Sequence, residues 1–313
     1  MNKIKSILIM SILVLSVLIV ISPVSAATYN VYPGNDIEAI IQGATSGDTI
    51  YVHAGTYYPT GTINVSGHPS IIGDSPSNTI IDFNHIGEGI DASSQDGVTI
   101  KNITVKNSTE TGILVDEECL IENCIVYGCA EDGFSADEDS TFKNCLSYDN
   151  GDDGFQDFND CIYINCTAAN NGDEGFYSIS GGSKYENCIS VGNTELGFYS
   201  NSANSLEIIY SNAWNNQQDY SNQVQGIGSI SVDPKFVNGI DTFYLSPGSP
   251  CVDKGSTSSA ALGLYEGFTT RTDGKWDTGT VDMGFHYKSN RGPPTLGLPI
   301  AKILEILKGN QEE

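Results

Sequence analysis

Apolar residues in this chain come in short runs separated by Asn, Gly and Asp, and the runs recur at a fixed interval. Between about residues 48 and 245 they are rich in β-branched and aromatic side chains and carry no helical period. An Asn marks the interval in one series and a Gly followed by Ile or Phe in a second, and both series step by 21, 21, 21 and then 22 residues. The members are Asn102, Asn123, Asn144, Asn165 and Asn187, and Gly112, Gly133, Gly154, Gly175 and Gly197.

A period near 20 residues indicates one supersecondary unit stacked on copies of itself. Short strands joined by tight turns predict an all-β fold, a single-stranded right-handed parallel β-helix with about 21 residues per coil and coils about 4.8 Å apart. Two apolar columns are expected to fill its core. They are Ile100, Ile121, Phe142, Tyr163 and Tyr185 before the Asn turn, and Ile113, Phe134, Phe155, Phe176 and Phe198 after the Gly.

The rest of the chain is organised around this repeat. We predict a signal peptide at 1–26, an N-terminal cap and first coil at 27–58, β-helix repeats at 59–231, an irregular C-terminal closing segment at 232–288, and a linker with a short amphipathic helix at 289–313. An uncleaved membrane anchor is the alternative for the first segment, whose apolar run is short for a bilayer span. The last helix, 300–307, is expected to dock on the solenoid, with a membrane surface or a partner as the alternative.

The N-terminal cap should contain a short helix within residues 35–47. Asn35 is the expected N-cap, an acid follows early, Ile37, Ile40 and Ile41 form an apolar face, and a Gly ends the segment. Such a helix would cover strand edges that otherwise recruit other chains.

Three polar columns are expected to stack in register. The repeat Asn residues should form a ladder of side-chain amides. Behind them Cys124, Cys145, Cys166 and Cys188 should be buried free thiols, because stacked side chains point the same way and are poorly aimed for disulfides; Cys119, Cys129, Cys161 and Cys251 stay undecided. In front of them Lys101, Glu122 and Lys143 alternate in sign, as in a solvated salt-bridge ladder.

The charge balance excludes one class of partner. The chain has 39 acidic and 14 basic residues, a formal net charge of −25, and removal of a signal containing Lys3 and Lys5 would give 12 − 39 = −27. Because a protein that binds nucleic acid must neutralise phosphates, nucleic acid is not expected as a partner. Cations and sugars are better candidates.

Acidic residues recur directly before the repeat Gly. Five coils in succession place an acid two residues before it: Glu110, Glu131, Asp152, Asp173 and Glu195. Three of these coils add a second acid. Carboxylates stacked at the coil spacing repel, and Ca²⁺, which takes hard oxygen ligands at about 2.4 Å, would bridge neighbouring coils. The predicted ligands are Asp132, Asp152, Asp153, Asp173 and Glu174, with Asp157 and Asp137 available to complete a shell.

The alternative is a set of solvated turn acids that are screened by salt. A transition metal is not expected, because the four histidines share no repeat column. Four tyrosines, Tyr127, Tyr148, Tyr177 and Tyr199, are candidate stacking platforms for a glycan, with ordinary coil-on-coil stacking as the alternative.

The segment Asp149-Asn-Gly-Asp-Asp-Gly-Phe155 resembles the calcium-dependent pectate lyases of polysaccharide lyase family 9. The resemblance implies a right-handed β-helix of the pectin lyase type in which Asp152 and Asp153 bind calcium. Two positions depart from the family pattern. Gln156 stands where the family has a further Asp, and Tyr177 and Tyr199 follow the later Gly-Phe pairs where the family places a catalytic Lys. The first coil and the closing segment resemble those of exported β-helix repeat proteins in general.

The sequence therefore favours an exported β-helix surface protein, secreted or held at the cell surface, that binds calcium and carbohydrate through the acidic turn column. The expected partner is an acidic or neutral polysaccharide or a cell-surface component, and the protein is expected to be a monomer. The alternatives are a calcium-dependent polysaccharide lyase acting on polyuronates and a purely structural module. No catalytic residue is assigned, because a tyrosine of ordinary pKa is a poor base at neutral pH.

Overall fold

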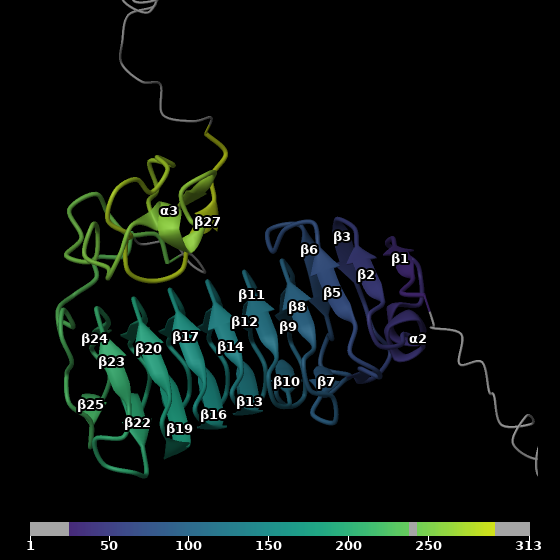
Figure 1. The fold of residues 1–313 in the computed structure, drawn as a ribbon, viewed down its shortest axis with the longest axis horizontal. Coiled ribbons are helices and arrows are strands. Elements are labelled where there is room, and N and C mark those ends of the chain that lie inside the picture. Colours follow the sequence, from purple (N-terminus) through teal and green to yellow (C-terminus); the bar gives the residue numbers. More distant parts are fainter. Residues whose placement is uncertain (1–24, 238–242, 292–313) are drawn as a thin grey trace, which may run out of the picture.

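In the computed structural model, which describes residues 25–237 and 243–291, the chain winds into a right-handed parallel β-helix of about nine coils (Figure 1). Each full coil contributes one strand to each of three parallel sheets. Sheet A contains β1 (Thr28–Val31), β2 (Thr49–Val52), β5 (Ser70–Gly73), β8 (Thr99–Lys101), β11 (Leu120–Glu122), β14 (Thr141–Lys143), β17 (Ile162–Ile164), β20 (Lys184–Glu186) and β23 (Glu207–Ile209).

The other two sheets have the same parallel order. Sheet B contains β3 (Gly55–Tyr57), β6 (Thr79–Asp82), β9 (Thr104–Lys106), β12 (Ile125–Tyr127), β15 (Leu146–Tyr148), β18 (Thr167–Ala169), β21 (Ile189–Val191) and β24 (Asn212–Trp214). Sheet C contains β4 (Ile63–Asn64), β7 (Ile90–Ala92), β10 (Ile113–Val115), β13 (Phe134–Glu138), β16 (Phe155–Asn159), β19 (Phe176–Gly181), β22 (Leu196–Ser200) and β25 (Gln218–Ser221).

The repeat Asn forms the corner between sheets A and B. Asn102, Asn123 and Asn144 have φ of 59°, 55° and 51°, a left-handed conformation that Asn tolerates better than most residues. Their amides stack as expected, with Asn123 Nδ2 donating to Asn102 Oδ1 at 2.8 Å and Asn144 Nδ2 donating to Asn123 Oδ1 at 3.1 Å. The alternating charges beside them are also paired, because Glu122 lies 2.7 Å from Lys101 Nζ and 3.4 Å from Lys143 Nζ.

The interior is built from the two expected columns. Phe155 stacks in parallel on Phe134 at 4.8 Å and on Phe176 at 4.9 Å between ring centroids, and it meets Tyr163 edge-on. These rings are buried. All eight cysteines are buried free thiols, including the four whose state the sequence left undecided.

The N-terminal helix is shorter than predicted and has a different cap. Helix α2 (Ile37–Gln42) begins after Asp36, whose carboxylate accepts from Ala39 N at 3.0 Å, and it ends at Gly43. Asn35 is not the N-cap, because its Oδ1 already accepts from Tyr32 N at 2.8 Å in the preceding turn. Ile37 and Ile41 are buried as expected.

The closing segment folds back along the outside of the solenoid and lies beside sheet B (Figure 1). Its regular elements are α3 (Ser259–Leu262), β26 (Phe268–Thr269) and β27 (Tyr287–Lys288). Phe285 packs against Leu146 and Tyr148 of β15. The backbone of His286 exchanges two hydrogen bonds with the Asn144 side chain, at 2.7 and 2.9 Å, so the corner ladder also anchors this segment.

Within the described residues, no helix is long and apolar enough to cross a membrane. The predicted signal peptide up to residue 24 and the predicted helix at 300–307 lie outside the described residues.

Candidate metal centre

The acidic turns lie between sheet B and sheet C, where each coil leaves one sheet and enters the next. An inner ladder of Asn residues holds these turns in place: Asn150, Asn171 and Asn193 are buried, and Asn216 at its end is half-buried. Each Nδ2 donates to the Oδ1 of the next coil, at 3.1, 2.9 and 2.9 Å in that order. This ladder was not predicted from the sequence, although the spacings of 21, 22 and 23 residues between its members indicate it.

The Gly that follows the acids is required by close packing. A Cβ on Gly154 would lie 2.7 Å from the backbone oxygen of Gly175 and 2.7 Å from Asn171 Nδ2, so no larger residue fits. The acidic turn is therefore pressed against the coil beside it, and the positions of the preceding carboxylates follow from the coil spacing.

The acids form two tiers. Asp132, Asp153 and Glu174 make up an inner tier whose members are at most 9% exposed. Glu131, Asp152 and Asp173 form an outer tier that is more accessible. Backbone amides orient the inner tier, because Asp153 N donates to Asp132 Oδ1 at 3.0 Å and Glu174 N donates to Asp153 Oδ1 at 2.8 Å.

All five predicted metal ligands come together in two overlapping clusters, and neither of the two reserve residues joins them. In each cluster one carboxylate oxygen from every member lies within 4.8 Å of the others, and Asp153 belongs to both. The clusters are Asp132, Asp152 and Asp153, and Asp153, Asp173 and Glu174. A cation with oxygens at about 2.4 Å spans donor pairs separated by up to about 4.8 Å, so this spacing suits calcium.

The electrostatics also favour a cation. Burial raises the pKa of Asp132 from 3.8 to about 8, and the neighbouring charge of Asp153 adds to it. Burial likewise raises the pKa of Asp153 and of Glu174. In the described part of the chain no ion pair joins these carboxylates to a Lys or Arg. Their negative charge can therefore be neutralised only by protonation or by a bound cation. All the donors are hard oxygens, which fits calcium and does not fit a thiophilic metal.

Asp157 does not join this centre. It follows the turn on β16, and its alternation with Gln156 points it into the core, where it is fully buried. Its carboxylate accepts from Ser178 and Ser183 at 2.7 Å and from Tyr163 at 2.9 Å. The side chain expected to complete a metal shell is thus part of an internal hydroxyl network, because strand residues alternate between the two faces of a sheet. Asp137, the other reserve ligand, is exposed and belongs to neither cluster.

The four tyrosines divide between two surfaces. Tyr177 and Tyr199 are paired neighbours on sheet C with ring centroids 5.3 Å apart, and both hydroxyls bond Asn201. They lie on the strands that the acidic turns enter. Tyr127 and Tyr148 stack on sheet B instead, and Tyr148 is only 4% exposed because the closing segment, including Phe243, covers it. Tyr148 is therefore not an open platform.

The strands of sheet C, which the acidic turns enter, contain no lysine. Lys143 and Lys184 belong to sheet A, where they pair with Glu122 at 3.4 Å and with Glu186 at 3.1 Å. Tyr177 occupies the strand position after the Gly-Phe pair, and burial raises its pKa above 10.0. The deprotonated form that could act as a base is therefore even less populated at neutral pH than it is for an exposed tyrosine.

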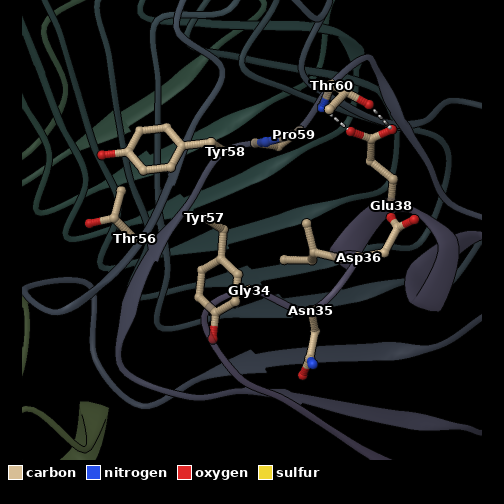
Figure 2. A pocket seen from close by; sticks show the side chains of 10 residues that line it. Gly34, Asn35, Asp36, Glu38, Thr56, Tyr57, Tyr58, Pro59 and Thr60 are labelled. Carbon is tan, nitrogen blue, oxygen red and sulfur yellow. Dashed lines mark hydrogen bonds between the residues drawn. The ribbon is translucent and has the colours of Figure 1, made fainter.

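A separate cavity of about 370 Å³ lies at the N-terminal cap (Figure 2). Figure 2 shows the Glu38 carboxylate directed at Thr60, and Glu38 also accepts from Gly61 N at 3.1 Å. Asp36 is engaged as the helix N-cap. Both acids of this cavity, Asp36 and Glu38, therefore already accept hydrogen bonds from nearby backbone N–H groups.

Comparisons with known proteins agree with this architecture. The family described as "Pel9A-like, right handed beta helix region" matches residues 24–183. The structure is similar to the crystal structure of pectate lyase Pel9A, with a TM-score of 0.50 and 15% identity over 84% of this chain and 97% of that one. It is also similar to the catalytic unit of a GH87 α-1,3-glucanase from Streptomyces thermodiastaticus, with a TM-score of 0.52 and 13% identity over 66% of this chain and 42% of that one. A comparison with curated protein sequences finds no match.

Proposed function

This chain belongs to the Pel9A-like right-handed β-helix family, and we propose that it is an exported protein that binds calcium at its acidic turns and a polysaccharide on the adjoining face of sheet C. Asp153 would be the central ligand, shared by both carboxylate clusters. Asp132 and Asp152 on one side, and Asp173 and Glu174 on the other, would complete the protein's share of the coordination.

The observation that carries the calcium proposal is the buried inner tier. Asp132 and Asp153 are 7% and 3% exposed, they come from neighbouring coils, and burial raises the pKa of both. Burying stacked carboxylates away from water is unfavourable unless protons or a cation neutralise their charge. Calcium would do so with several oxygens at once while keeping the carboxylates ionised.

The polysaccharide proposal uses the outer face of the strands that follow these turns. Gln156, Tyr177 and Tyr199 are register partners on β16, β19 and β22, and they lie side by side across three coils. Gln156 Nε2 donates to Asp153 Oδ2 at 3.2 Å, which links this row to the acidic turns. An amide and two phenol rings provide hydrogen bonds and stacking surfaces for sugar rings.

The alternative is a calcium-dependent lyase that acts on polyuronates. Family membership favours it, whereas the side chains argue for binding without cleavage. A lyase needs a base that removes a proton next to the uronate carboxylate, and the row on sheet C offers Gln156, Tyr177 and Tyr199 at that face. Two lysines of the repeat, Lys143 and Lys184, are held in ion pairs on sheet A.

Calorimetric titration of residues 27–313 with calcium tests the metal proposal. We expect heat of binding and a rise in melting temperature, since a ligand at about 100 times its Kd adds about 2.7 kcal/mol to the stability of the folded state. Asp153→Asn should abolish both effects, because it removes a charge from both clusters. Glu266→Gln, which removes an exposed charge in the closing segment, is the matched control. Unchanged calcium binding in Asp153→Asn would refute the assignment.

Polygalacturonate with and without calcium separates binding from cleavage. We expect retention of the polymer by the protein in calcium and no absorbance from unsaturated products. Product formation that disappears in Asp152→Ala and Asp153→Ala would establish the lyase alternative. Loss of retention in Tyr177→Ala with calcium binding intact would support the sheet C face as the carbohydrate surface.

A further inference from the structure

Both arginines of this acidic chain line the same cavity. Arg271 and Arg291 are the only arginines among 39 acidic and 14 basic residues. They line a cavity of about 350 Å³ in the closing segment, together with Lys288. This cavity is separate from the acidic turns, because it is formed by the loop after β26 and by the residues that include and follow β27.

Arg271 has donor capacity that the protein does not use. Its Nη2 bonds Asp273 Oδ2 at 2.7 Å, which places one side of the guanidinium. Its Nε is buried, and no acceptor among the described residues lies within hydrogen-bond distance. Because buried polar groups in folded proteins are nearly always hydrogen-bonded, this donor points to a missing acceptor.

The second arginine, Arg291, lies in the segment that follows β27, across from the turn at Gly274. Ser289 Oγ donates to Gly274 O at 2.6 Å and accepts from Arg291 N at 3.1 Å, while Trp276 Nε1 donates to Arg291 O at 2.8 Å. These bonds fix the backbone of Arg291 beside the turn at Gly274, where its side chain packs. The cationic end of Lys288 lies 4.9 Å from the centre of the Phe268 ring.

The net charge of the cavity is positive. Three cations, Arg271, Lys288 and Arg291, face one anion, Asp273, whose pKa the neighbouring Arg271 and the backbone of Lys275 hold below its usual range. A positive cavity on a strongly negative protein concentrates an anionic group that the rest of the surface repels.

We propose that this cavity binds the carboxylate of an acidic saccharide. Two planar guanidinium groups match the geometry of a carboxylate better than lysines would. The hydroxyls of Thr272 and Ser289 and the ring of Tyr244 complete a lining that suits a sugar ring. The proposal does not depend on calcium, so it stands or falls separately from the acidic turns.

Titration of residues 27–313 with trigalacturonate in the presence of EDTA tests it, because EDTA silences any calcium-dependent binding. We expect binding that weakens as salt rises and that falls about tenfold in Arg291→Gln, the loss expected for one charge-assisted contact. Arg271→Lys should also weaken binding, since it keeps the charge but removes the planar guanidinium that can donate two parallel hydrogen bonds to a carboxylate. Lys235→Gln, which removes an exposed charge of the closing segment outside this cavity, should bind as the parent does.

The ligand series decides the chemical class. A neutral trisaccharide of galactose should not bind, and inorganic sulfate should compete only weakly with trigalacturonate. No binding of trigalacturonate by a folded protein in EDTA, binding that is equal in Arg291→Gln, or binding of sulfate as tight as that of trigalacturonate would each overturn the proposal. Arg291 is the primary target, because it is exposed and its replacement should leave the melting temperature unchanged.

Discussion

Equivalent polar contacts recur in successive coils of the solenoid, whereas each contact that attaches the closing segment to the solenoid occurs only once. Asn150, Asn171 and Asn193 bond one another as equivalents along the solenoid. His286 meets Asn144 through its backbone, and its ring is enclosed between Gly284 O at 2.9 Å and Asp277 at 2.7 Å. Both regions hydrogen-bond most of their buried polar groups, with exceptions such as Arg271 Nε, but they do so by different means.

The difference also extends to charge. Stacking places like carboxylates together in the solenoid, because every coil repeats its neighbour, and the closing segment gathers the two arginines. Repetition thus stacks carboxylates as a consequence of periodicity, whereas the aperiodic region can assemble basic side chains from distant positions. If this interpretation is correct, a substitution in the coils should destabilise the whole solenoid, whereas a substitution in the closing segment should affect only the structure around it.

The largest effect is expected from a core ring of the solenoid. Phe155→Ala removes a ring that stacks between Phe134 and Phe176, and should lower the free energy of unfolding by about 3–5 kcal/mol in urea titrations. Phe158→Ala on the same strand is the control. Its side chain is 42% exposed, so the change should stay within about 0.5 kcal/mol. Equal losses in the two variants would contradict the column packing.

The acidic turns should give the calcium-free protein an unusual pH dependence. The pKa of Asp132 is raised from 3.8 to about 8 on folding, so the folded state binds more protons than the unfolded state between these values. The stabilising contribution is complete below about pH 3.8 and is lost as the pH rises through about 8. The free energy of unfolding in EDTA should therefore fall by about a few kcal/mol from pH 5 to pH 9, and the melting temperature should fall with it.

Calcium should remove most of this pH dependence, because it replaces the bound protons. Thermal unfolding measured across the same pH range with and without calcium provides the check. Parallel curves in the two conditions would mean that the cation does not bind these carboxylates.

The junction between the two regions can be weakened alone. Asn144→Ala leaves the His286 backbone groups without partners and should cost about 1–3 kcal/mol, expressed as faster hydrogen exchange around residue 286. Asn102→Ala is a matched control, because Asn102 has a similar left-handed φ and makes no hydrogen bond to the described residues of the closing segment. Equal exchange in both variants would show that the ladder does not anchor this segment.

The smallest effect is expected on the solvated face of sheet A. Glu122→Gln breaks the pairs with Lys101 and Lys143 and should cost no more than about 1 kcal/mol at low salt. The difference should vanish at about 1 M salt, where screening is nearly complete at these distances. A larger loss that persists in salt would indicate that the ladder has a packing role.

Much of the fold follows from the sequence because periodicity is a one-dimensional signal. The 21-residue interval predicts the coil, the core rings, the Asn corner and the acid column, since equivalent residues must stack. The direction of a side chain is harder to predict where a strand begins. Asp157 was expected beside the metal and lies inside, because the boundary between turn and strand decides the face to which each residue points.

Contacts between distant segments are absent from the periodic signal. The cover over Tyr148 comes from residues about 95–140 positions later in the chain, and no spacing rule relates them. The inner Asn ladder is a different case, because its intervals drift from 21 to 23 and so hide a column that the structure keeps in register. Asp36 and Asn35 are both good capping residues, and only the bond to Tyr32 N distinguishes them.

The single 22-residue step of the repeat has a definite place in space. Between β16 and β19 the register changes from Asp157 opposite Ser178 to Asn159 opposite Gly181, so the extra residue is accommodated as a bulge in β19, where sheet C approaches the corner to sheet A. Acidic turns and core rings keep their alignment on either side of it. Added length at this position leaves the neighbouring columns intact. This position is therefore suited to the insertion of a foreign loop into the solenoid.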